Sequence, residues 1–405
     1  MRNLGQLILL ALVISLTACG TQKPAITDQP SDAITQIPNV PTNTPLPVAT
    51  APATQTPTLV PTPGLPLFSD DHLKSQIDRL ATAFLKNNRN PGLSIAVVIR
   101  DPQTGQLEAM LLNYGTTAKG GGQPVTSDTV YEIGSITKAF TGILLAEAVN
   151  AGKVKLDDPI QNYLPPDVHA PTYKDKDIPI TILNLATHRA SLPRDPASDD
   201  MQDIYSWLDT FKPAHAPGSQ YVYSNLGYAL LGDILARLSG NDYGTLEFQS
   251  LSQPLGLMDT TEALSDDQAS RLAQGYTYDG SLMPYFPMSG ALSSAGYLRS
   301  TLNDMTRFLI DNMQPDTTPL ASSLRLAQTV EAEGRNPGSG AGLGWDINRP
   351  GAPDESIWKG GVTPGFSSYI SFRRDGSSGF VILTNGQLAD SLASSIADLL
   401  DEYGR

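Results

Sequence analysis

The sequence predicts an α/β (α+β) fold in which one mainly antiparallel sheet is formed from N- and C-terminal segments, is flanked by helices and carries an inserted, largely helical region. Apolar runs typical of strands occur early, within residues 93–115, and return late, within residues 342–385. Between them, residues 155–310 show mainly helical patterns broken by proline-rich loops. Strands at both ends with helices between them indicate a sheet assembled from distant parts of the chain.

The first elements of the folded part have clear local signals. A helix is expected from about Asp70, where apolar residues recur at helical spacing. Residues 93–100 and 107–115 are two short apolar runs on either side of the turn-forming segment 101–105. The pattern therefore predicts a β-hairpin after the first helix.

Later elements follow the same reasoning. A long helix is expected from Ser135 to Ala151, because the apolar pattern ends at a glycine. Further strands are expected at residues 342–347, 367–374 and 379–385. A final helix is expected from about Leu388.

The composition describes a folded, acidic protein. Hydrophobic residues make up 40% of the 405 residues and charged residues 17%, so wholesale disorder is not expected. The formal net charge of -14 repels phosphate backbones, and no basic stripe with interleaved aromatics is present, so a nucleic-acid partner is not expected. No HxH or HExxH pattern occurs and Cys19 is the only cysteine, so neither a metal nor another cofactor is expected. The G-x-S-x-G turn of common Ser-His-Asp hydrolases is also missing.

Residues 1–19 have the features of a lipoprotein signal peptide. Arg2 precedes an apolar run that is too short to span a bilayer comfortably, and small residues follow up to Cys19. The tetrapeptide LTAC resembles the bacterial lipobox, in which the cysteine is lipidated and becomes the mature N-terminus. The resemblance implies an extracytoplasmic protein of the bacterial cell envelope, anchored to a membrane by a lipid on Cys19. The alternative is an ordinary signal peptide with an incidental cysteine.

Residues 20–66 are predicted to be a disordered tether. Pro, Thr, Ala and Gln dominate this segment, which cannot bury enough apolar surface to order itself. At about 3.1 Å per residue, roughly 45 residues reach at most about 140 Å. The tether could carry a catalytic domain, expected at residues 67–405, into the cell wall; the alternative is a spacer without a target.

The first candidate catalytic feature is Ser135 with Lys138. Residues three apart on a helix share a face, so the lysine can reach the serine hydroxyl and act as its base. A helix N-terminus beside the serine favours developing negative charge. The pattern Ser-x-x-Lys is weak by itself, and a second copy joins Ser356 to Lys359. That copy lies in a strand-like segment, where residues three apart face opposite sides, and it is rejected as a catalytic pair.

The second candidate feature is the Tyr-Ser-Asn segment of Tyr223 and Asn225. It occurs where a loop is expected to enter a helix, so its side chains can project into a cleft. A tyrosine near lysines ionises more easily and can act as a general base. The amide of Asn225 can hold a substrate amide or orient a lysine. The alternative is a packed tyrosine with Asn225 as a helix cap.

The third candidate feature begins at Lys359. Its ammonium can attract a carboxylate, while Gly360 and Gly361 let a substrate backbone lie against the protein. The backbone N–H groups of Val362 and Ser135 could together form an oxyanion hole. The alternative is a glycine-rich turn between strands.

In this order, the three motifs resemble those of the serine β-lactamase and D-alanyl-D-alanine carboxypeptidase superfamily, in its class C branch. The likeness extends over nearly all of residues 70–405, through segments such as LDDPIQNYLP, YSNLGYALLGDIL and LSSAGYLRSTLNDMTRFL. It implies a β-lactamase/transpeptidase-like fold. It also implies that Ser135 attacks a carbonyl, that Lys138 and Tyr223 handle its proton, and that Tyr223 protonates the leaving amine. Asn225 would position the acyl side chain, and Lys359 would supply the electrostatic field and hold the substrate carboxylate.

The sequence departs from the family pattern in two places. Gly360 replaces a residue that usually carries a hydroxyl for the substrate carboxylate, and LATHRASLPR replaces the usual LLTHTSGLP. Arg189 and Arg194 in that second segment add positive charge that could compensate.

Together, these features predict a serine hydrolase acting on peptidoglycan peptides that end in D-alanine, as a carboxypeptidase or endopeptidase. A class C-like β-lactamase or an esterase is an alternative with the same site, since fold and motif do not separate these activities. A non-catalytic receptor for penicillin or peptidoglycan is an alternative of another class.

Overall fold

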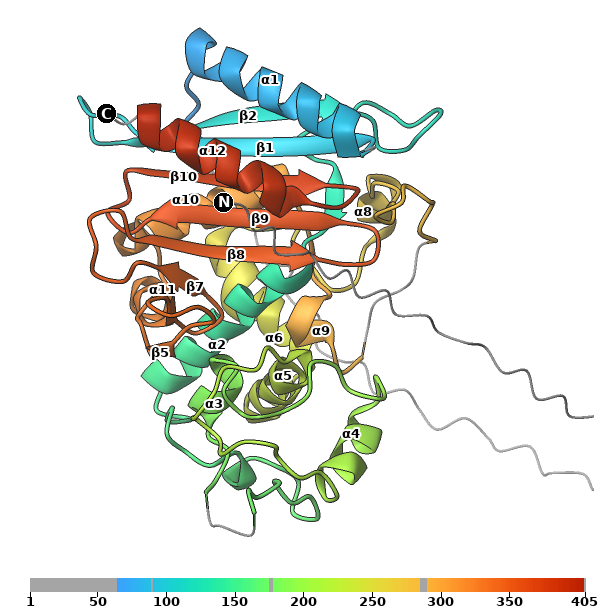
Figure 1. The fold of residues 1–405 in the computed structure, drawn as a ribbon, viewed down its shortest axis with the longest axis vertical. Coiled ribbons are helices and arrows are strands. Elements are labelled where there is room, and N and C mark those ends of the chain that lie inside the picture. Colours follow the sequence, from blue (N-terminus) through green and yellow to red (C-terminus); the bar gives the residue numbers. More distant parts are fainter. Residues whose placement is uncertain (1–63, 89, 175–177, 285–289, 404–405) are drawn as a thin grey trace, which may run out of the picture. The chain divides into compact units, whose positions relative to one another are not determined.

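An eight-stranded antiparallel sheet organises the described part of the chain (Figure 1). The computed structural model describes residues 64–88, 90–174, 178–284 and 290–403, so the predicted signal peptide, Cys19 and nearly all of the predicted tether lie outside the described residues. The strands of the sheet are β1 (Gly92–Arg100), β2 (Leu107–Gly115), β5 (Ala332–Glu333), β6 (Gly340–Ala341), β7 (Asp346–Asn348), β8 (Ser356–Val362), β9 (Ser367–Arg373) and β10 (Ser378–Thr384). Their order is β2-β1-β10-β9-β8-β7-β6-β5.

The centre of the sheet joins the two ends of the folded part. Strand β1 forms the expected hairpin with β2 on one side and pairs with β10 on the other, where Ile95 lies opposite Ile382. Most of β1 is buried, as expected for an apolar central strand. The predicted fold class, with one mainly antiparallel sheet built from N- and C-terminal segments, is therefore confirmed.

The helices cover the sheet and fill the region inserted between its two halves. They are α1 (Asp71–Asn88), α2 (Thr137–Asn150), α3 (Ile182–Ala186), α4 (Met201–Leu208), α5 (Asn225–Ser239), α6 (Tyr243–Glu247), α7 (Gln253–Leu255), α8 (Asp266–Ser270), α9 (Ser293–Gly296), α10 (Leu302–Met313), α11 (Ala321–Ala327) and α12 (Ala389–Tyr403). Two short strands, β3 (Val130–Glu132) and β4 (Arg299–Thr301), form a separate antiparallel sheet that was not expected from the sequence.

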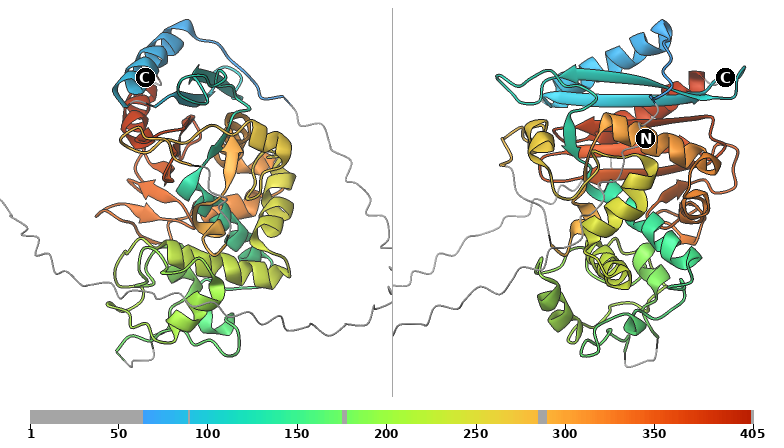
Figure 2. Two further views of the ribbon diagram at one scale, coloured as in Figure 1. Left: turned by 90° about the vertical axis from the view of Figure 1, so that its right-hand side faces the viewer. Right: turned by 180° about the vertical axis from the view of Figure 1, so that it is seen from behind.

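The two faces of the sheet have different cores. Helices α1 and α12 lie on one face, where they pack on Ile95 and Val97 of β1 (Figures 1 and 2). The alternate residues Ala96 and Val98 face the other side and join the larger core with α2, α5 and α10. The larger core holds the helices that carry the candidate catalytic residues.

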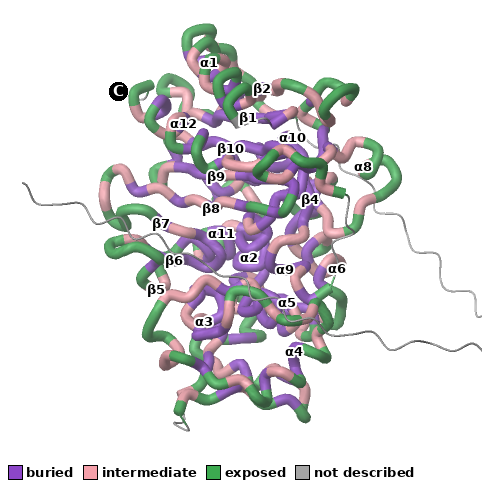
Figure 3. Tube along the Cα trace, turned by 45° about the vertical axis from the view of Figure 1, so that its right-hand side comes forward, coloured by how far each residue is buried: buried purple, intermediate pink, exposed green. Residues whose placement is uncertain are grey.

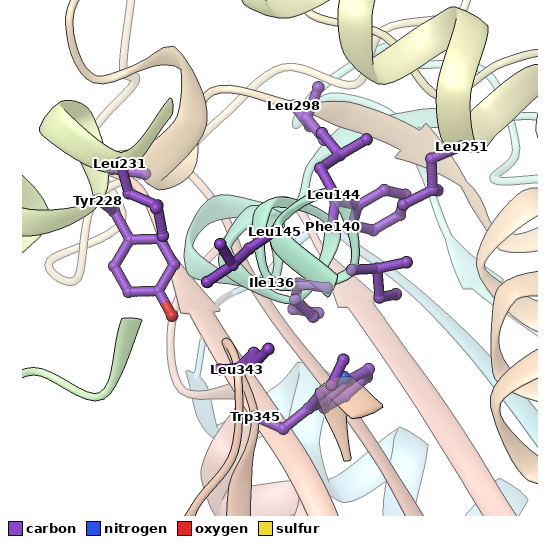
Figure 4. Close-up of a cluster of buried hydrophobic side chains, with 14 of the residues drawn as sticks. Ile136, Phe140, Leu144, Leu145, Tyr228, Leu231, Leu251, Leu298, Leu343 and Trp345 are labelled. Carbon is purple, nitrogen blue, oxygen red and sulfur yellow. The ribbon is translucent and has the colours of Figure 1, made fainter. Parts of the chain in front are cut away.

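Helix α2 is buried at the middle of this larger core. Figure 3 shows it as a buried segment, and in Figure 4 the α2 side chains Phe140 and Leu144 lie beside Leu298 and Leu251 from other parts of the chain. A β-carbon on Gly142 would lie only 1.9 Å from the carbonyl oxygen of Leu343. A buried helix packed this closely gives a rigid support for residues at its N-terminus.

The strand expected at residues 342–347 is wrong for its first four residues. Gly342 donates its backbone N–H to the carbonyl of Trp345 at 2.9 Å, which closes a turn between β6 and β7. Gly344 adopts a positive φ of 82°, and a β-carbon there would lie 2.0 Å from the carbonyl oxygen of Lys138. The turn follows from close packing against α2, which the local apolar pattern does not encode.

Candidate active site

Ser135 lies in a short 3-10 turn, Gly134–Ile136, which leads directly into α2. The expected helix therefore begins two residues late as an α-helix, although its end near Asn150 is as predicted. Gly134 has a positive φ of 52°, and a β-carbon there would lie 2.6 Å from the backbone nitrogen of Val362. Glycine thus allows the turn to lie against β8 while Ser135 stays partly accessible.

Lys138 lies one turn further along, and its ammonium nitrogen contacts three oxygens. It is 3.2 Å from Oγ of Ser135, 2.7 Å from Oδ1 of Asn225 and 2.5 Å from the carbonyl oxygen of Ala295. The residue is fully buried, and this burial lowers the pKa of Lys138, with the charges of Lys359 and Arg194 acting in the same direction. Lys138 can therefore exchange a proton with its neighbours more readily than an exposed lysine.

Tyr223 and Asn225 come from the start of α5, as predicted. The N-cap of this helix is Ser224, whose hydroxyl accepts the N–H of Gly227 at 2.9 Å. The alternative in which Asn225 caps the helix is therefore wrong. Because Ser224 does the capping, the Asn225 side chain is free to accept from Lys138 and to donate to Oδ1 of Asp195 at 2.5 Å.

The phenol of Tyr223 lies 2.6 Å from the hydroxyl of Ser135. Burial by itself would raise the pKa of Tyr223, but the positive charges of Lys138 and Lys359, with the hydrogen bonds from Ser135 and Lys138, lower it to about 8. A phenolate at this position is placed to remove the proton of Ser135.

Lys359 is held in the interior of the sheet by an acidic partner. Its ammonium lies 2.9 Å from Oδ2 of Asp346 on β7 and 5.9 Å from the centre of the Tyr223 ring. Burial opposes its charge, but Asp346 and the two neighbouring tyrosines, Tyr221 and Tyr223, raise the pKa of Lys359 above the usual range. Lys359 therefore remains a fixed positive charge beside Tyr223.

The second Ser-x-x-Lys pair is separated as expected. Ser356 and Lys359 both lie in β8, where residues three apart point to opposite faces. Ser356 pairs across the sheet with Arg373 at the far end of the strand from Val362. Ser356 is not part of the candidate site.

The two glycines after Lys359 lie within β8, so the alternative of a glycine-rich turn is wrong for them. At Gly361, a β-carbon would lie 2.0 Å from the carbonyl oxygen of Ile133, so only glycine permits this approach to the turn of Ser135. At Gly360, a β-carbon would make only ordinary contacts, the nearest being 3.5 Å from the ring of Tyr369. A β-carbon is therefore accommodated at 360 but not at 361.

The backbone nitrogen of Val362 lies beside the turn of Ser135, since a β-carbon on Gly134 would be 2.6 Å from it. Thr363, the residue after β8, donates its backbone N–H to the carbonyl oxygen of Phe366, the residue before β9, so the N–H of Thr363 points toward β9. Since alternate N–H groups of an antiparallel strand point in opposite directions, that of Val362 points away from β9. Strand β7 pairs with β8 only as far as Trp358. The pairing of the Val362 and Ser135 N–H groups as oxyanion donors stays a prediction, with which this direction of the Val362 N–H is compatible.

The ring of His188 packs against the ring of Tyr223. Its Nδ1 accepts the backbone N–H of Ser224 at 3.1 Å, and its ring centre lies 4.4 Å from that of Tyr223. Burial, followed by the charges of Lys359 and Lys138, lowers the pKa of His188 well below its usual value. A neutral, buried ring with these contacts has a structural part in placing Tyr223.

The two arginines of the divergent loop have different positions. The guanidinium of Arg194 lies 5.0 Å from the centre of the Tyr223 ring, whereas that of Arg189 donates to the backbone carbonyls of Gly218 and Glu333 at 2.9 Å each. Of these two arginines, only Arg194 lies against a candidate catalytic residue.

Three partners of the site carry no sequence signal of their own: Asp195, Asp346 and the carbonyl of Ala295. Each belongs to a loop, a strand end or a four-residue helix, and each is brought in by tertiary packing. Within the described ranges, no three His, Cys, Asp or Glu side chains are grouped so that they could hold a metal ion. A search of the same residues finds no helix that could cross a membrane.

Comparison with known proteins gives one consistent result. The family model described as "Beta-lactamase" matches residues 77–404. The chain is 30% identical to the D-alanyl-D-alanine-carboxypeptidase/endopeptidase AmpH of Escherichia coli (strain K12), over 83% of this chain and 91% of that protein. It is also 30% identical to a β-lactamase of Pseudomonas fluorescens, over 77% and 93% respectively. A solved class C β-lactamase superposes with a TM-score of 0.73 at 25% identity, covering 82% of this chain and 97% of that structure.

Proposed function

The chain belongs to the β-lactamase family of serine hydrolases, and we propose that within this family it is a D-alanyl-D-alanine carboxypeptidase or endopeptidase that acts on peptidoglycan peptides. The observation that carries the proposed chemistry is the position of the Ser135 hydroxyl, 2.6 Å from the Tyr223 phenol and 3.2 Å from the Lys138 ammonium. The similarity to a protein named as a carboxypeptidase/endopeptidase supports the choice of peptide substrates.

In the proposed acylation step, Ser135 is the nucleophile. Its Oγ forms a bond to the carbonyl carbon, while its proton passes to the phenolate of Tyr223. The hydroxyl of Ser135 can donate to Tyr223 and accept from Lys138 at the same time, so the charged lysine stabilises the phenolate without leaving its place. If Lys138 is neutral instead, it still donates to Asn225 and Ala295 and turns its lone pair to Ser135. Either protonation state fits the same heavy-atom positions.

The rest of the cycle uses groups already in place. The N–H groups of Ser135 and Val362 would stabilise the negative oxygen of the tetrahedral intermediate. As the C–N bond breaks, Tyr223 would return its proton to the leaving nitrogen, which departs as a neutral amine. Lys359 stays positive throughout and favours the phenolate of Tyr223. Water activated by Tyr223 would then cleave the acyl-enzyme and restore Ser135.

A class C-like β-lactamase activity is the second candidate. It is favoured by the 30% identity to the Pseudomonas fluorescens β-lactamase, which equals the identity to the carboxypeptidase. The two activities share acylation and differ in how fast water releases the acyl group. An esterase would use the same residues.

The proposed location follows from the N-terminal sequence. A lipid on Cys19 would anchor the protein outside the cytoplasm, and the segment 20–66 would let the catalytic domain, 67–405, reach peptidoglycan. This placement supports a peptidoglycan substrate over a diffusing one. Replacing Cys19 by Ala should release the protein from membranes; equal membrane retention, with no lipid mass on the wild type, would contradict the anchor.

The test of the proposed function is a comparison of products from three substrate classes. The purified protein is incubated with muropeptides ending in D-Ala-D-Ala, with a panel of penicillins and cephalosporins, and with an activated ester. Release of D-alanine or cleavage of peptide cross-links, with slow turnover of β-lactams, is expected. Fast turnover of β-lactams without any release of D-alanine would favour the second candidate.

A further inference from the structure

The ammonium of Lys359 is poorly placed to contact a substrate directly. Its side chain is only 4% exposed, and it is paired with Asp346 at 2.9 Å. The next residue, Gly360, has no hydroxyl to offer. A substrate that ends in a carboxylate therefore needs another cation at the mouth of the site, because an unpaired carboxylate in such a site would be unfavourable.

The backbone of Arg194 is fixed beside the catalytic groups. Its carbonyl oxygen accepts the N–H of Asn225 at 2.6 Å, at the start of α5. The hydroxyl of Ser224 donates to the carbonyl of the preceding residue, Pro193, at 2.6 Å. The loop therefore holds Arg194 in register with Tyr223.

The Arg194 side chain is both close to the site and available. Its guanidinium lies 5.0 Å from the centre of the Tyr223 ring and contributes to the lowered pKa of Lys138. Its ion pair with Asp195 spans 3.6 Å, with 70% of the Arg194 side chain and 54% of the Asp195 side chain exposed, so it is weak. Asp195 is held more firmly by Asn225, at 2.5 Å. A ligand carboxylate can therefore replace Asp195 as the partner of Arg194.

We propose that Arg194 binds the carboxylate of the substrate's leaving group. This assignment rests on the proposed function, in which Tyr223 gives its proton to the leaving nitrogen. In a C-terminal D-amino acid the carboxylate is attached to the carbon next to that nitrogen, so it lies near the Tyr223 ring and within reach of Arg194. A guanidinium can grip a carboxylate through two parallel hydrogen bonds, which Lys359 in its buried pair cannot do. In this assignment the positive charge of Lys359 favours the phenolate of Tyr223, and Arg194 recognises the carboxylate of the leaving group.

Two acyl-D-alanyl thioesters test the proposal without requiring peptidase activity. In one the leaving thiol carries a carboxylate, and in the other it carries a carboxamide of nearly the same size. The measured quantity is the ratio of kcat/KM for the acid to kcat/KM for the amide. Removing a charge-assisted pair is expected to lower this ratio by about 10- to 100-fold in Arg194→Gln. Arg194→Lys should recover part of the ratio, because it keeps the charge and loses the two-pronged geometry.

Arg189→Gln is the matched control, since Arg189 lies in the same divergent segment and binds backbone carbonyls. Its ratio should equal that of the wild type. An unchanged ratio in Arg194→Gln, even with lower rates on both thioesters, would overturn the assignment and leave Arg194 a structural role. The same acid-to-amide ratio measured as Kd in Ser135→Ala gives the result independently of turnover.

The failure of the proposed function looks different. A wild-type protein that cleaves both thioesters but releases no D-alanine from peptides would contradict the peptidase activity. The thioester ratio would still decide the role of Arg194.

Discussion

The hydroxyl oxygens of Tyr223 and Ser135 lie 2.6 Å apart, and this contact joins the start of α5 to the turn before α2. Lys138 and Lys359 lie 5.0 and 5.9 Å from the centre of the same tyrosine ring. Two cations on a buried phenol explain why its pKa is lowered to about 8 despite the opposing effect of burial.

A pH dependence follows from the lowered pKa of Tyr223. The phenolate is the reactive form, so kcat/KM should fall as the pH drops below about 8, toward a tenfold loss per pH unit. Because Tyr223 and Lys138 share protons, the apparent pKa belongs to the pair. Tyr223→Phe should lower kcat/KM by about 10²- to 10⁴-fold. A pH–rate profile on an activated ester checks both points; an identical profile in Tyr223→Phe would exclude the phenol as the base.

The pair of Lys359 and Asp346 should be coupled in stability. Asp346→Asn leaves a buried ammonium without its partner, so the free energy of unfolding should decrease by about 3 kcal/mol. The loss of the carboxylate also removes the main cause of the raised pKa of Lys359. The double variant Asp346→Asn with Lys359→Met should recover most of the stability in urea denaturation. If the losses in the free energy of unfolding of the two single variants simply add up in the double variant, Lys359 and Asp346 do not act as a coupled pair.

Of the two neighbouring glycines of β8, Gly361 should be sensitive to substitution and Gly360 should not. Gly361→Ala places a β-carbon 2.0 Å from the carbonyl of Ile133, so β8 must move away from the turn of Ser135. The melting temperature and the rate of acylation should both fall. Gly360→Ala is the control, because a β-carbon there makes only contacts of 3.5 Å or more. Equal losses in both variants would show that close packing at Gly361 is not what positions Ser135.

The pairing of β1 with β10 predicts that the two halves of the fold depend on each other. An isolated fragment of residues 67–250 would contain β1 and β2 but lack β8, β9 and β10, and its central strand would have no partner on one side. The fragment should therefore show no sharp thermal transition by circular dichroism. Cooperative unfolding of the fragment would contradict this dependence.

Local patterns in the sequence were sufficient for much of this architecture. The hairpin of β1 and β2 and the late strands β9 and β10 were predicted within one or two residues, because each is an apolar run bounded by turn residues. The contact between Ser135 and Lys138 could be predicted because their spacing fits one turn of a helix. The turn at residues 342–345 could not be predicted, since it depends on contact with α2 rather than on the local pattern.

The supporting charges of the site were also beyond sequence reasoning. Asp346 lies 13 residues before Lys359 on the adjacent strand, so pairing them requires the register of β7 with β8. Asp195 meets Asn225 only because the loop after α3 packs on the start of α5. Neither aspartate belongs to a motif, and the sequence offers many other aspartates with the same local appearance.

The position of the covalent adduct tests the central claim most directly. The protein is treated with a fluorescent penicillin or a fluorophosphonate, and the modified peptide is identified by mass spectrometry. One adduct per molecule is expected on the peptide that contains Ser135, absent in Ser135→Ala and retained in Ser356→Ala. A stoichiometric adduct in Ser135→Ala, or a loss of labelling in Ser356→Ala alone, would contradict the proposed site.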